Sequence, residues 1–221
     1  MTSQDTIHKQ EHWDGSYSAR PLEELGWYQE NPFPSLTLIQ ELELPKNARQ
    51  FHAGTGASTL VDHLLRAGYS ELVLNDISGR ALSTLRQRLG SRSSELEWVE
   101  DDLLEPTKLQ SIEAVRLWHD RAVFHFFTSP EEQESYIRML DRILEPDGHL
   151  ILGTFSLDGP EKCSGLPVQR YDIDSLTQRF SDAFEPIEVF EYLHKNPRGQ
   201  DRPYIYGHFK KRGATENMDR S

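Results

Sequence analysis

The sequence predicts an α/β protein built around a doubly wound, mostly parallel sheet. Residues 48–53 are a short apolar segment that runs into two glycines one residue apart, Gly54 and Gly56, and a helical pattern of leucines follows directly. Strand, tight glycine turn and helix form one unit of such a sheet. Residues 71–76 read as a second buried strand, which ends in Asp76. Strands that alternate with helices in this way favour a parallel sheet.

Length and composition exclude several classes of protein. A chain of 221 residues fits one α/β domain with short extensions. The formal net charge of −12 argues against nucleic acid as a partner. The sequence has no apolar run of membrane-spanning length and no apolar core of a signal peptide near its start, and its only cysteine is Cys163. We therefore expect a cytoplasmic protein without a membrane partner, a disulfide within the chain or a metal site, and we make no prediction of its oligomeric state.

The N-terminal segment is rich in aromatic residues, glycine and proline. Residues 1–12 are polar and are expected to fray. Trp13, Trp27 and Tyr28 then either pack on the main domain for stability or close over a site and exclude water, and the two roles are compatible. We expect a cap or lid over residues 1–35, a main domain over residues 36–212 and a disordered tail over residues 213–221. Ser35 is a candidate N-cap for a helix that extends to residue 44.

The glycine turn and the acid after the second strand predict a nucleoside site. Glycine tolerates positive φ and allows a ligand to approach the bare backbone. Asp76 follows Gly56 by 20 residues, and an acid at this place can accept both ribose hydroxyls of a nucleoside. The alternative is that Asp76 caps the helix that begins near Ser78. The combination of both glycines with the acid favours the nucleoside.

The rest of the chain continues the alternation of helices and strands. The expected elements are a helix over 81–89 ended by Gly90, a strand over 96–102, a strand over 114–120 continuing to 127, a helix from Ser129 to 144, a strand over 149–155, a long loop over 156–169, a helix over 173–180, and two strands over 187–193 and 204–210.

Polar residues gather where the third and fourth strands end. An acid such as Asp102 can accept a hydrogen bond from an exocyclic amine, with Leu103 against the ring, whereas Asp101 is expected to face solvent. His119, Arg121 and His125 fall within seven residues. Either histidine alone would fit a protein core. Together with the arginine, at the edge where open α/β sheets bind ligands, they indicate a site.

Three longer motifs resemble the class I S-adenosylmethionine-dependent methyltransferases, and the likeness covers roughly residues 13–211. Small bacterial members have a Trp-Asp-x-x-Tyr start, a His-Asp-Arg-Ala-Val-x-His-Phe segment after the fourth strand and a Cys-Ser-Gly-Leu-Pro-Val segment after the fifth. This chain has them at residues 13–17, 119–126 and 163–168. The mitochondrial citrate synthase lysine methyltransferase resembles the chain more distantly.

The resemblance implies a Rossmann-like, seven-stranded sheet with an antiparallel C-terminal strand, a helical lid and S-adenosylmethionine as cofactor. The family usually has an acid two residues before the first glycine, where this chain has His52. Cofactor contacts are expected from Trp13, Tyr17, Gly54, Gly56, Ala57, Asp76, Ile77, Asp102, Leu103 and His119. Contacts with the acceptor are expected from Trp27, Tyr28, Arg121 and Cys163, and catalytic roles from His119, Arg121 and His125.

The residues after the fourth strand bear on the methyl acceptor. Methyl transfer from a sulfonium is an in-line displacement, so the acceptor must present a lone pair. A basic or neutral set suits an acceptor that becomes an anion, namely a thiol, a phenol or a carboxylic acid, with His125 as the general base. We expect a small-molecule acceptor, with a small thiol as the leading candidate. The alternatives are a protein-lysine N-methyltransferase and a non-catalytic cofactor-binding protein. The number of carboxylates around the donor methyl separates amine from anionic acceptors.

Overall fold

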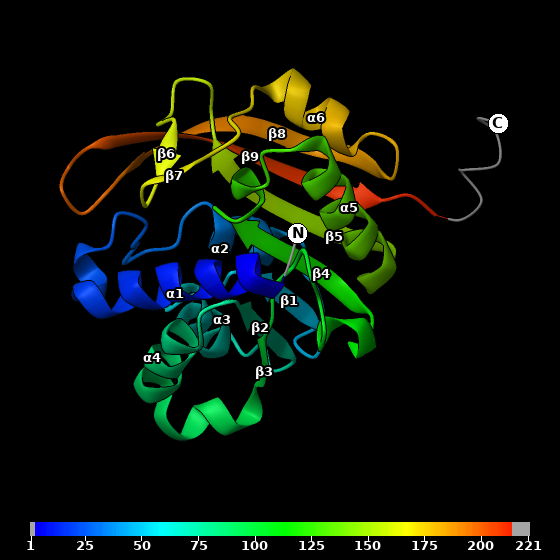
Figure 1. Ribbon diagram of the computed structural model, residues 1–221. Coiled ribbons are helices and arrows are strands. Elements are labelled where there is room, and N and C mark those ends of the chain that lie inside the picture. The colour runs from blue at the N-terminus through cyan, green and yellow to red at the C-terminus, as the bar shows by residue number, and fades with distance from the viewer. Residues whose placement is uncertain (1–2, 214–221) are drawn as a thin grey trace.

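A seven-stranded sheet organises the chain in the computed structural model, which describes residues 3–213. The strand order is β3-β2-β1-β4-β5-β9-β8 (Figure 1). The five strands from β3 to β5 are parallel to their neighbours, whereas β9 is antiparallel to both β5 and β8. This confirms the predicted fold class. The predicted disordered tail lies, beyond Gly213, outside the described residues.

The first three strands of the sheet begin and end close to the predicted positions, whereas the fourth and fifth differ at one end. The strands of the sheet are β1 (Gln50–Ala53), β2 (Leu72–Asp76), β3 (Glu97–Glu100), β4 (Val115–Arg121), β5 (Leu144–Phe155), β8 (Phe184–Lys195) and β9 (Asp201–Lys211). The predicted loop between β5 and β8 also contains a short hairpin of β6 (Lys162–Cys163) and β7 (Leu166–Pro167).

Helices cover both faces of the sheet. The α-helices are α1 (Ser3–Ala19), α2 (Ser35–Glu41), α3 (Leu60–Arg66), α4 (Gly79–Leu89), α5 (Pro130–Ile143) and α6 (Ile173–Phe180). The 3₁₀ turns are η1 (Leu22–Glu24), η2 (Gly90–Glu95), η3 (Leu109–Ser111) and η4 (Phe124–Phe126). One apolar cluster joins α5 and α6 to the sheet, and a second joins α2, α3 and α4 to its opposite face. Among residues 3–213, no helix is both long enough and apolar enough to cross a membrane.

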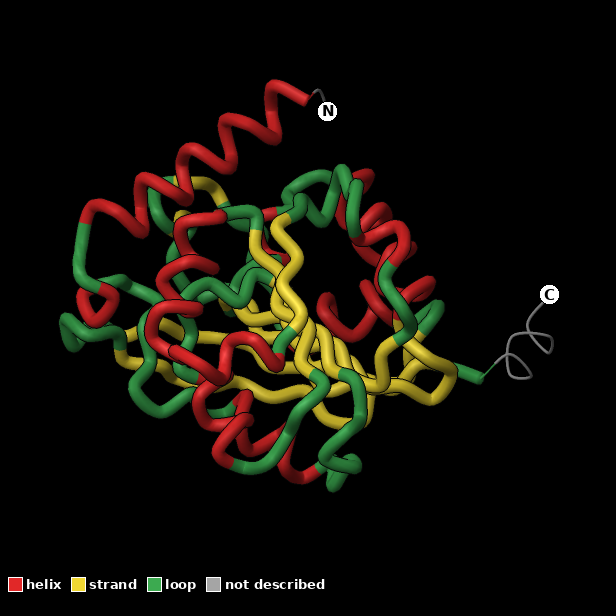
Figure 2. The backbone as a smooth tube through the Cα atoms, turned by 90° about the horizontal axis from the view of Figure 1, so that it is seen from below, coloured by secondary structure: helices red, strands yellow, loops and turns green. Residues whose placement is uncertain are grey.

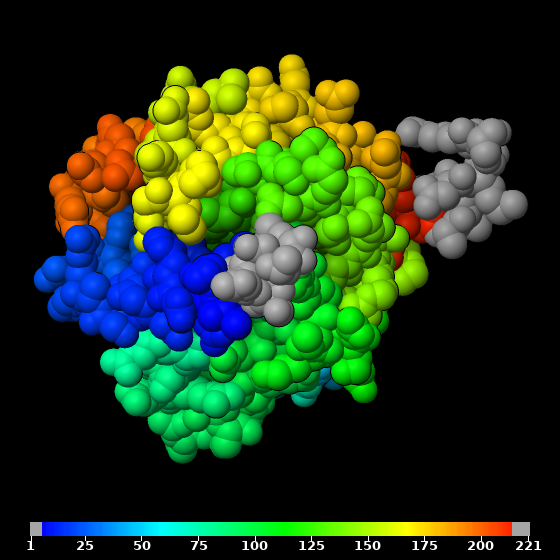
Figure 3. Space-filling model, in the orientation of Figure 1, coloured from blue at the N-terminus to red at the C-terminus, as the bar shows by residue number. Residues whose placement is uncertain are grey.

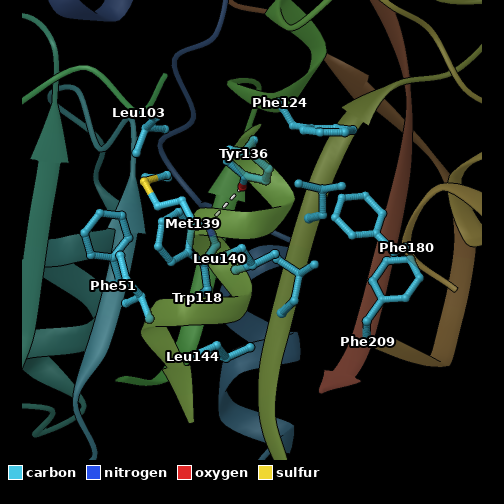
Figure 4. Packing of buried hydrophobic residues seen from close by; sticks show 14 of the residues in the cluster. Phe51, Leu103, Trp118, Phe124, Tyr136, Met139, Leu140, Leu144, Phe180 and Phe209 are labelled. Carbon is cyan, nitrogen blue, oxygen red and sulfur yellow. Dashed lines mark hydrogen bonds between the residues drawn. The ribbon is translucent and has the colours of Figure 1, made fainter. Parts of the chain in front are cut away.

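Aromatic packing fixes the direction of β4 within the first cluster. Phe51 and Trp118 stack with ring centroids 4.1 Å apart, and the indole N–H of Trp118 donates to the Tyr136 hydroxyl at 2.9 Å (Figure 4). Because side chains alternate along a strand, Trp118 and Asp120 point towards α5. His119 and Arg121 therefore point towards the opposite face.

Several predicted boundaries are wrong. Ser35 is the first residue of α2 rather than its N-cap, because its hydroxyl lies 2.9 Å from His119 Nε2 and caps no backbone N–H, and the helix ends at Glu41 rather than at residue 44. Residues 3–12, expected to fray, belong to α1, because polar side chains of that helix bond to β3 and the segment after it, as in the 2.9 Å bond from Gln10 to Glu100. The fourth strand ends at Arg121 rather than at residue 127, since the backbone turns into η4. The fifth strand begins at Leu144 rather than at residue 149. A register shift opposite residues 115–117 lets pairing continue through the Pro-Asp-Gly sequence.

Helix α1 lies outside the other layers, across the edge where the parallel strands end. In Figure 2 it is the outermost helix on its side of the molecule. In Figure 3 it occupies the surface between the β6–β7 hairpin and α4. The N-terminal segment is thus placed over the carboxyl ends of the strands. The division into a cap and a main domain at residue 35 stays a prediction.

Candidate functional site

Two adjoining cavities lie beneath α1 at the carboxyl ends of the parallel strands. The larger has a volume of about 280 Å³ and extends from the ends of β2 and β3 to the β6–β7 hairpin. The smaller has a volume of about 60 Å³ and lies between β1, β4 and the start of α2. Both are lined by Tyr17, Trp27, Gly54 and Arg121.

Most residues that the sequence predicted for the site line these cavities. The larger cavity is lined by Trp13, Tyr17, Trp27, Gly54, Asp76, Ile77, Asp102, Leu103, Arg121 and Cys163. The smaller cavity is lined by Tyr17, Trp27, Tyr28, Gly54, Ala57, His119 and Arg121. Gly56 lies directly under the Tyr17 hydroxyl, whereas His125 lines neither cavity.

The glycine turn after β1 packs closely against Val123 and the Tyr17 hydroxyl. Gly54 and Gly56 have φ angles of +52° and +56°, a region that favours glycine. A Cβ atom on either residue would collide with a neighbour, Val123 for the first and the Tyr17 hydroxyl for the second. Thr55 anchors the turn through its backbone N–H, which donates to the Asn75 carbonyl at 2.7 Å. The turn therefore requires both glycines.

Asp76 is buried and held by backbone donors. Its two carboxylate oxygens accept from Gly56 N at 2.7 Å and from Ser78 N at 2.8 Å. Burial raises the pKa of Asp76 to about 6, against these two hydrogen bonds. Ser78, rather than Asp76, is the N-cap of α4, because its hydroxyl accepts from Ala81 N at 3.0 Å. The carboxylate of Asp76 lines the large cavity, where each oxygen has a second lone pair for a hydroxyl donor.

The two acids after β3 have different roles. Asp102 lines the cavity, accepts from Leu104 N at 2.9 Å and receives the Thr6 hydroxyl of α1 at 3.1 Å. The prediction that Asp101 faces solvent is wrong, since only 9% of it is exposed. Its carboxylate accepts three backbone N–H groups from residues 107–109, at 2.8 to 3.1 Å, and so closes the loop after the strand.

Asp14 is a site neighbour that the sequence reading missed. Its carboxylate accepts from the Ser78 hydroxyl at 2.6 Å and from Arg80 N at 3.1 Å, at the start of α4. This bond ties α1 to the segment that follows Asp76. The Trp-Asp-x-x-Tyr motif contains the residue, but nothing in the sequence names its partner.

Asp120 and Arg121 are consecutive residues with opposite surroundings. The Asp120 carboxylate is fully buried and accepts from Val123 N at 3.0 Å and from the Tyr136 hydroxyl at 2.7 Å. Arg121 donates from Nε to the Tyr206 hydroxyl at 3.2 Å and from Nη1 to the Trp27 carbonyl at 3.0 Å. Its guanidinium also lies 4.9 Å from the ring centroid of Tyr204. The remaining nitrogen, Nη2, is buried and has no partner within the described part of the chain.

A row of residues across three strands sets the position of Arg121. Arg121 on β4 is in register with Gly153 on β5, and Gly153 is in register with Tyr206 on β9. A Cβ atom at Gly153 would lie 2.8 Å from the Tyr206 ring. The glycine therefore leaves the space through which Tyr206 reaches the guanidinium, and the sequence reading identified neither residue.

Two neutral imidazoles line the small cavity. The rings of His52 and His119 are 5.4 Å apart, and His119 Nε2 lies 2.9 Å from the Ser35 hydroxyl. Burial lowers the pKa of His52 to about 3, and burial with the neighbouring His52 and Arg121 lowers the pKa of His119. Both are therefore uncharged at neutral pH. The residue in place of the family's acid is thus a hydrogen-bonding group without charge.

His125 is not positioned as the sequence predicted. It lies in η4 and is fully buried, with its ring 4.5 Å from that of Phe126 and 4.8 Å from that of Phe155. Burial lowers its pKa to about 3, assisted by Arg121. Because it lines neither cavity, its surroundings are those of a core residue rather than of a base beside an acceptor.

The described residues include no cluster of three or more histidine, cysteine or acidic side chains that could hold a metal ion. The charged and polar side chains that line the two cavities include carboxylates at the ends of β2 and β3, and a guanidinium with neutral imidazoles at the ends of β1 and β4.

Comparison with known sequences identifies the central part of the chain. Residues 51–152 match the family model of a methyltransferase domain. Mouse EEF1A lysine methyltransferase 2 is 26% identical over 162 residues, which cover 64% of this chain and 63% of that protein. The chain thus spans less than two thirds of the length of this relative.

Solved structures of low sequence identity share the fold. The enzyme structure reported for the conversion of a disulfide bond into a thioacetal group during echinomycin biosynthesis has a TM-score of 0.73 and 20% identity, with 96% of each chain covered. The 1,6-didemethyltoxoflavin-N1-methyltransferase of Burkholderia thailandensis, solved with S-adenosylhomocysteine, has a TM-score of 0.68 and 18% identity, covering 96% of this chain and 92% of that one.

Three features of the structure agree with the family match. They are the strand order of the sheet, the glycine turn with positive φ angles after β1, and the buried acid at the end of β2. Residues 51–152 therefore form a methyltransferase domain of the class I S-adenosylmethionine-dependent family, whose members are enzymes that take their methyl group from S-adenosylmethionine.

Proposed function

We propose that this protein transfers a methyl group from S-adenosylmethionine to a small thiol. The observation that carries the proposal is Arg121, a partly buried cation whose Nη2 is buried and has no partner among residues 3–213. It lines the large cavity at the end of β4. The carboxylates that line the same cavity are Asp76, Asp101 and Asp102, at the ends of β2 and β3. The acceptor end is thus cationic and the other end acidic.

The residues present fit the cofactor. The turn suits the methionine part at Gly54, which lines both cavities, so that a ligand can approach its backbone there. Asp76 is positioned to accept ribose hydroxyls, and Ile77, Asp102 and Leu103 line the place of the adenine. When bound, the cofactor supplies a methyl group that is already activated on a sulfonium.

Charge favours an anionic acceptor over a lysine amine. A lysine side chain is an ammonium in solution and would meet Arg121 as a like charge, without a carboxylate beside it among the described lining residues of that end. A thiol becomes a strong nucleophile on losing its proton, and a neighbouring arginine favours the thiolate. Phenols have higher pKa values, near 10, and carboxylates are weaker nucleophiles. A thiol therefore suits a single partly buried cation best.

The segment over the site excludes water. The Trp13 ring packs edge-on against Trp27 and against Phe126, with centroids 5.8 and 5.2 Å apart. The Trp27 indole N–H donates to the Tyr17 hydroxyl at 3.2 Å. We propose that residues 1–35 act as the cap of a catalytic domain over residues 36–212, since an in-line displacement depends on alignment and on a dry site.

The test is transfer of labelled methyl from S-adenosylmethionine into thiols, phenols, carboxylic acids and a cell lysate. We expect thiol methylation, with an Arg121→Gln variant losing about 10²-fold or more in turnover, in the range for a lost charge-stabilising donor. Arg116→Gln is the matched control, because it removes the same charge at the opposite end of β4. Transfer only to lysine would support the protein-lysine alternative. Cofactor binding without transfer to any acceptor would support the non-catalytic one.

The composition of the chain also bears on its partners and its cellular compartment. We infer that the acceptor is a small molecule and that the protein acts in the cytoplasm without nucleic acid or membrane. The negative net charge and the single cysteine support this inference.

A further inference from the structure

We infer that the acceptor is a compact apolar thiol that binds as a preformed thiolate, with Arg121 in the place that a general base would otherwise fill. This inference rests on the proposed function and names the substrate class of the same site. Two observations support it. Among residues 3–213, neither a carboxylate nor an imidazole that could act as a base is placed beside an acceptor at Arg121, and the side chains around the guanidinium leave one of its nitrogens without a partner.

The imidazoles of the site are not placed to accept a proton from an acceptor in the large cavity. His125 lines neither cavity, and its ring packs between Phe126 and Phe155. His52 and His119 line only the small cavity. Burial lowers the pKa of all three, so they are weak bases. None of them serves as a base poised near neutral pH.

The carboxylates of the large cavity are committed to the other end. Asp76 holds the backbone N–H groups of Gly56 and Ser78, and Asp101 holds the loop at 107–109. Asp102 accepts from Leu104 N and from the Thr6 hydroxyl. These acids follow β2 and β3, whereas Arg121 ends β4. An acceptor beside Arg121 therefore meets no carboxylate of this set.

The groups near Arg121 whose pKa values are shifted by burial are uncharged at neutral pH. They are Tyr204 on β9, Tyr192 and His194 on β8, Cys163 on β6, and His119 and His125 close to it in the chain. Tyr206 on β9 contacts Arg121 through the hydrogen bond from Nε. Burial raises the pKa of Cys163 to about 11, although Arg121 and Arg202 oppose the rise. Within the described chain, Arg121 has no ion-pair partner. A partly buried charge that lines a cavity and has no counter-ion indicates that the ligand supplies the anion.

The geometry of the guanidinium leaves one nitrogen for that anion. Nε is held by Tyr206 and Nη1 by the Trp27 carbonyl, so that Nη2 alone is unpartnered. A cation within about 4–6 Å of an acidic group lowers the pKa of that group by about 1–3. Below the thiol's own pKa, the thiolate fraction should therefore rise about 10- to 1,000-fold in the site.

The walls beside Arg121 select the shape of the acceptor. Trp13, Phe126, Phe127, Leu166 and Pro167 line the large cavity together with Arg121. These are rings and apolar side chains, which favour a compact aromatic or branched thiol. A thiol that carries an ammonium would bring a like charge to Arg121.

The methyl transfer then needs no general base from the protein. The thiol gives its proton to solvent before it binds. The thiolate lone pair forms the new bond from sulfur to the methyl carbon. The bond from that carbon to the sulfonium sulfur breaks, and its electron pair stays on the departing sulfur. The products are a methyl thioether and neutral S-adenosylhomocysteine.

The experiment measures kcat against pH at saturating thiol for a series of aromatic thiols of graded pKa, with the full chain and S-adenosylmethionine. We expect kcat to rise with pH and to level off at a pH that moves with the pKa of each thiol and lies about 1–3 below it, because kcat reports the pKa of the bound thiol. In Arg121→Gln the levelling pH should move up by about 1–3 for every thiol, and Arg121→Lys should restore part of the shift. Arg116→Gln should behave as the unmodified protein.

A second measurement does not depend on turnover. The ultraviolet absorbance of the thiolate is recorded for thiol bound to the protein with S-adenosylhomocysteine, at a pH below the thiol's pKa. We expect thiolate in the unmodified protein and thiol in Arg121→Gln. If the levelling pH is the same for all thiols, a base in the protein controls the reaction, and this inference is overturned while thiol methylation stands. If no thiol is methylated, the proposed function itself fails and the inference falls with it.

Discussion

The two ends of the large cavity are built in different ways. At the ends of β2 and β3, Asp76, Asp101 and Asp102 are each held by backbone N–H groups of the turns beside them. At the end of β4, Arg121 is held by the Tyr206 hydroxyl and the Trp27 carbonyl, 85 and 94 residues away in the chain. The acidic end depends on local turns. The cationic end depends on distant strands and on the N-terminal segment.

This difference predicts how each end responds to substitution. A backbone donor is removed only by a change of conformation, so the acids should keep their positions through most substitutions elsewhere. The guanidinium is positioned by side chains and by packing, so substitutions on another strand should disturb it. Substitutions at one end should therefore leave the other end largely unchanged.

The largest effect is expected for cofactor affinity in Asp76→Ala. The loss should be about 1.5–3 kcal/mol, the range for hydrogen bonds to a charged group, measured by calorimetry with S-adenosylhomocysteine. Glu71→Ala, at the opposite end of the same strand, should bind normally. The pKa of Asp76 is raised to about 6, so the ionised acceptor is lost on acidification through that pH. Affinity should therefore fall below about pH 6, and Asp76→Ala should not show this fall. Unchanged affinity in a folded Asp76→Ala protein would remove the ribose role.

The cationic end is tested from a neighbouring strand by Gly153→Ala. The added Cβ atom would lie 2.8 Å from the Tyr206 ring and push its hydroxyl away from Arg121. Such overpacking costs about 1–3 kcal/mol of unfolding free energy. Turnover with thiols should fall more than affinity for S-adenosylhomocysteine. Tyr206→Phe is the milder companion, since it removes one hydrogen bond of about 0.5–1.5 kcal/mol. Normal turnover in both variants would mean that the row across β4, β5 and β9 does not position Arg121.

His125→Phe separates a core residue from a base. Both ring nitrogens of His125 are buried without a partner in the described structure, so an apolar ring of similar shape should raise the unfolding free energy by about 1 kcal/mol. Turnover should stay unchanged, measured with the same thiols. A folded variant that loses turnover at every pH except high pH would restore the predicted base.

The same substitution has a pH signature in stability. The folded pKa of His125 is about 3 and the ordinary value is 6.5, so between these values the unfolded chain binds the extra proton. Stability therefore falls as the pH drops below 6.5, by about 1.4 kcal/mol per pH unit for each such histidine. Asp76 and Asp120, whose pKa values are raised to about 6, oppose this trend below that pH. Unfolding free energies measured with urea at a series of pH values check this. Below pH 6.5, the slope of free energy against pH should be smaller in His125→Phe by the contribution of one proton, about 1.4 kcal/mol per pH unit.

The smallest effect is expected where α1 is tied to the acidic end. Asp14→Ala removes the acceptor for the Ser78 hydroxyl and Arg80 N, and should cost about 0.5–1.5 kcal/mol. Hydrogen exchange of the α1 amides should become faster, and thiol turnover should fall modestly as water reaches the site. Glu11→Ala on the same helix, whose side chain is 71% exposed, is the control. Exchange that stays slow in Asp14→Ala would show that other contacts hold α1.

The sequence by itself determined the features that depend on neighbouring residues. The strand, glycine turn and helix around Gly54, the capping of α5 by Ser129 and the end of α4 at Gly90 were all predicted. Each is decided within a few residues, by φ preferences and by side chains that bond to the adjacent backbone. The position of Asp76 at the end of a buried strand follows in the same way.

Only the tertiary structure decided the features that join distant segments. The N-terminal residues form a helix because Asp14 accepts from the start of α4 and Thr6 donates to Asp102, and no local pattern in the sequence identifies those partners. The end of β4 at Arg121 put His125 into the core rather than the cavity. The environment of Arg121 depends on the registers of β4, β5 and β9, which bring Gly153 and Tyr206 beside it. A sequence shows that an arginine is charged, but whether its charge is neutralised depends on burial and partners that only folding brings together.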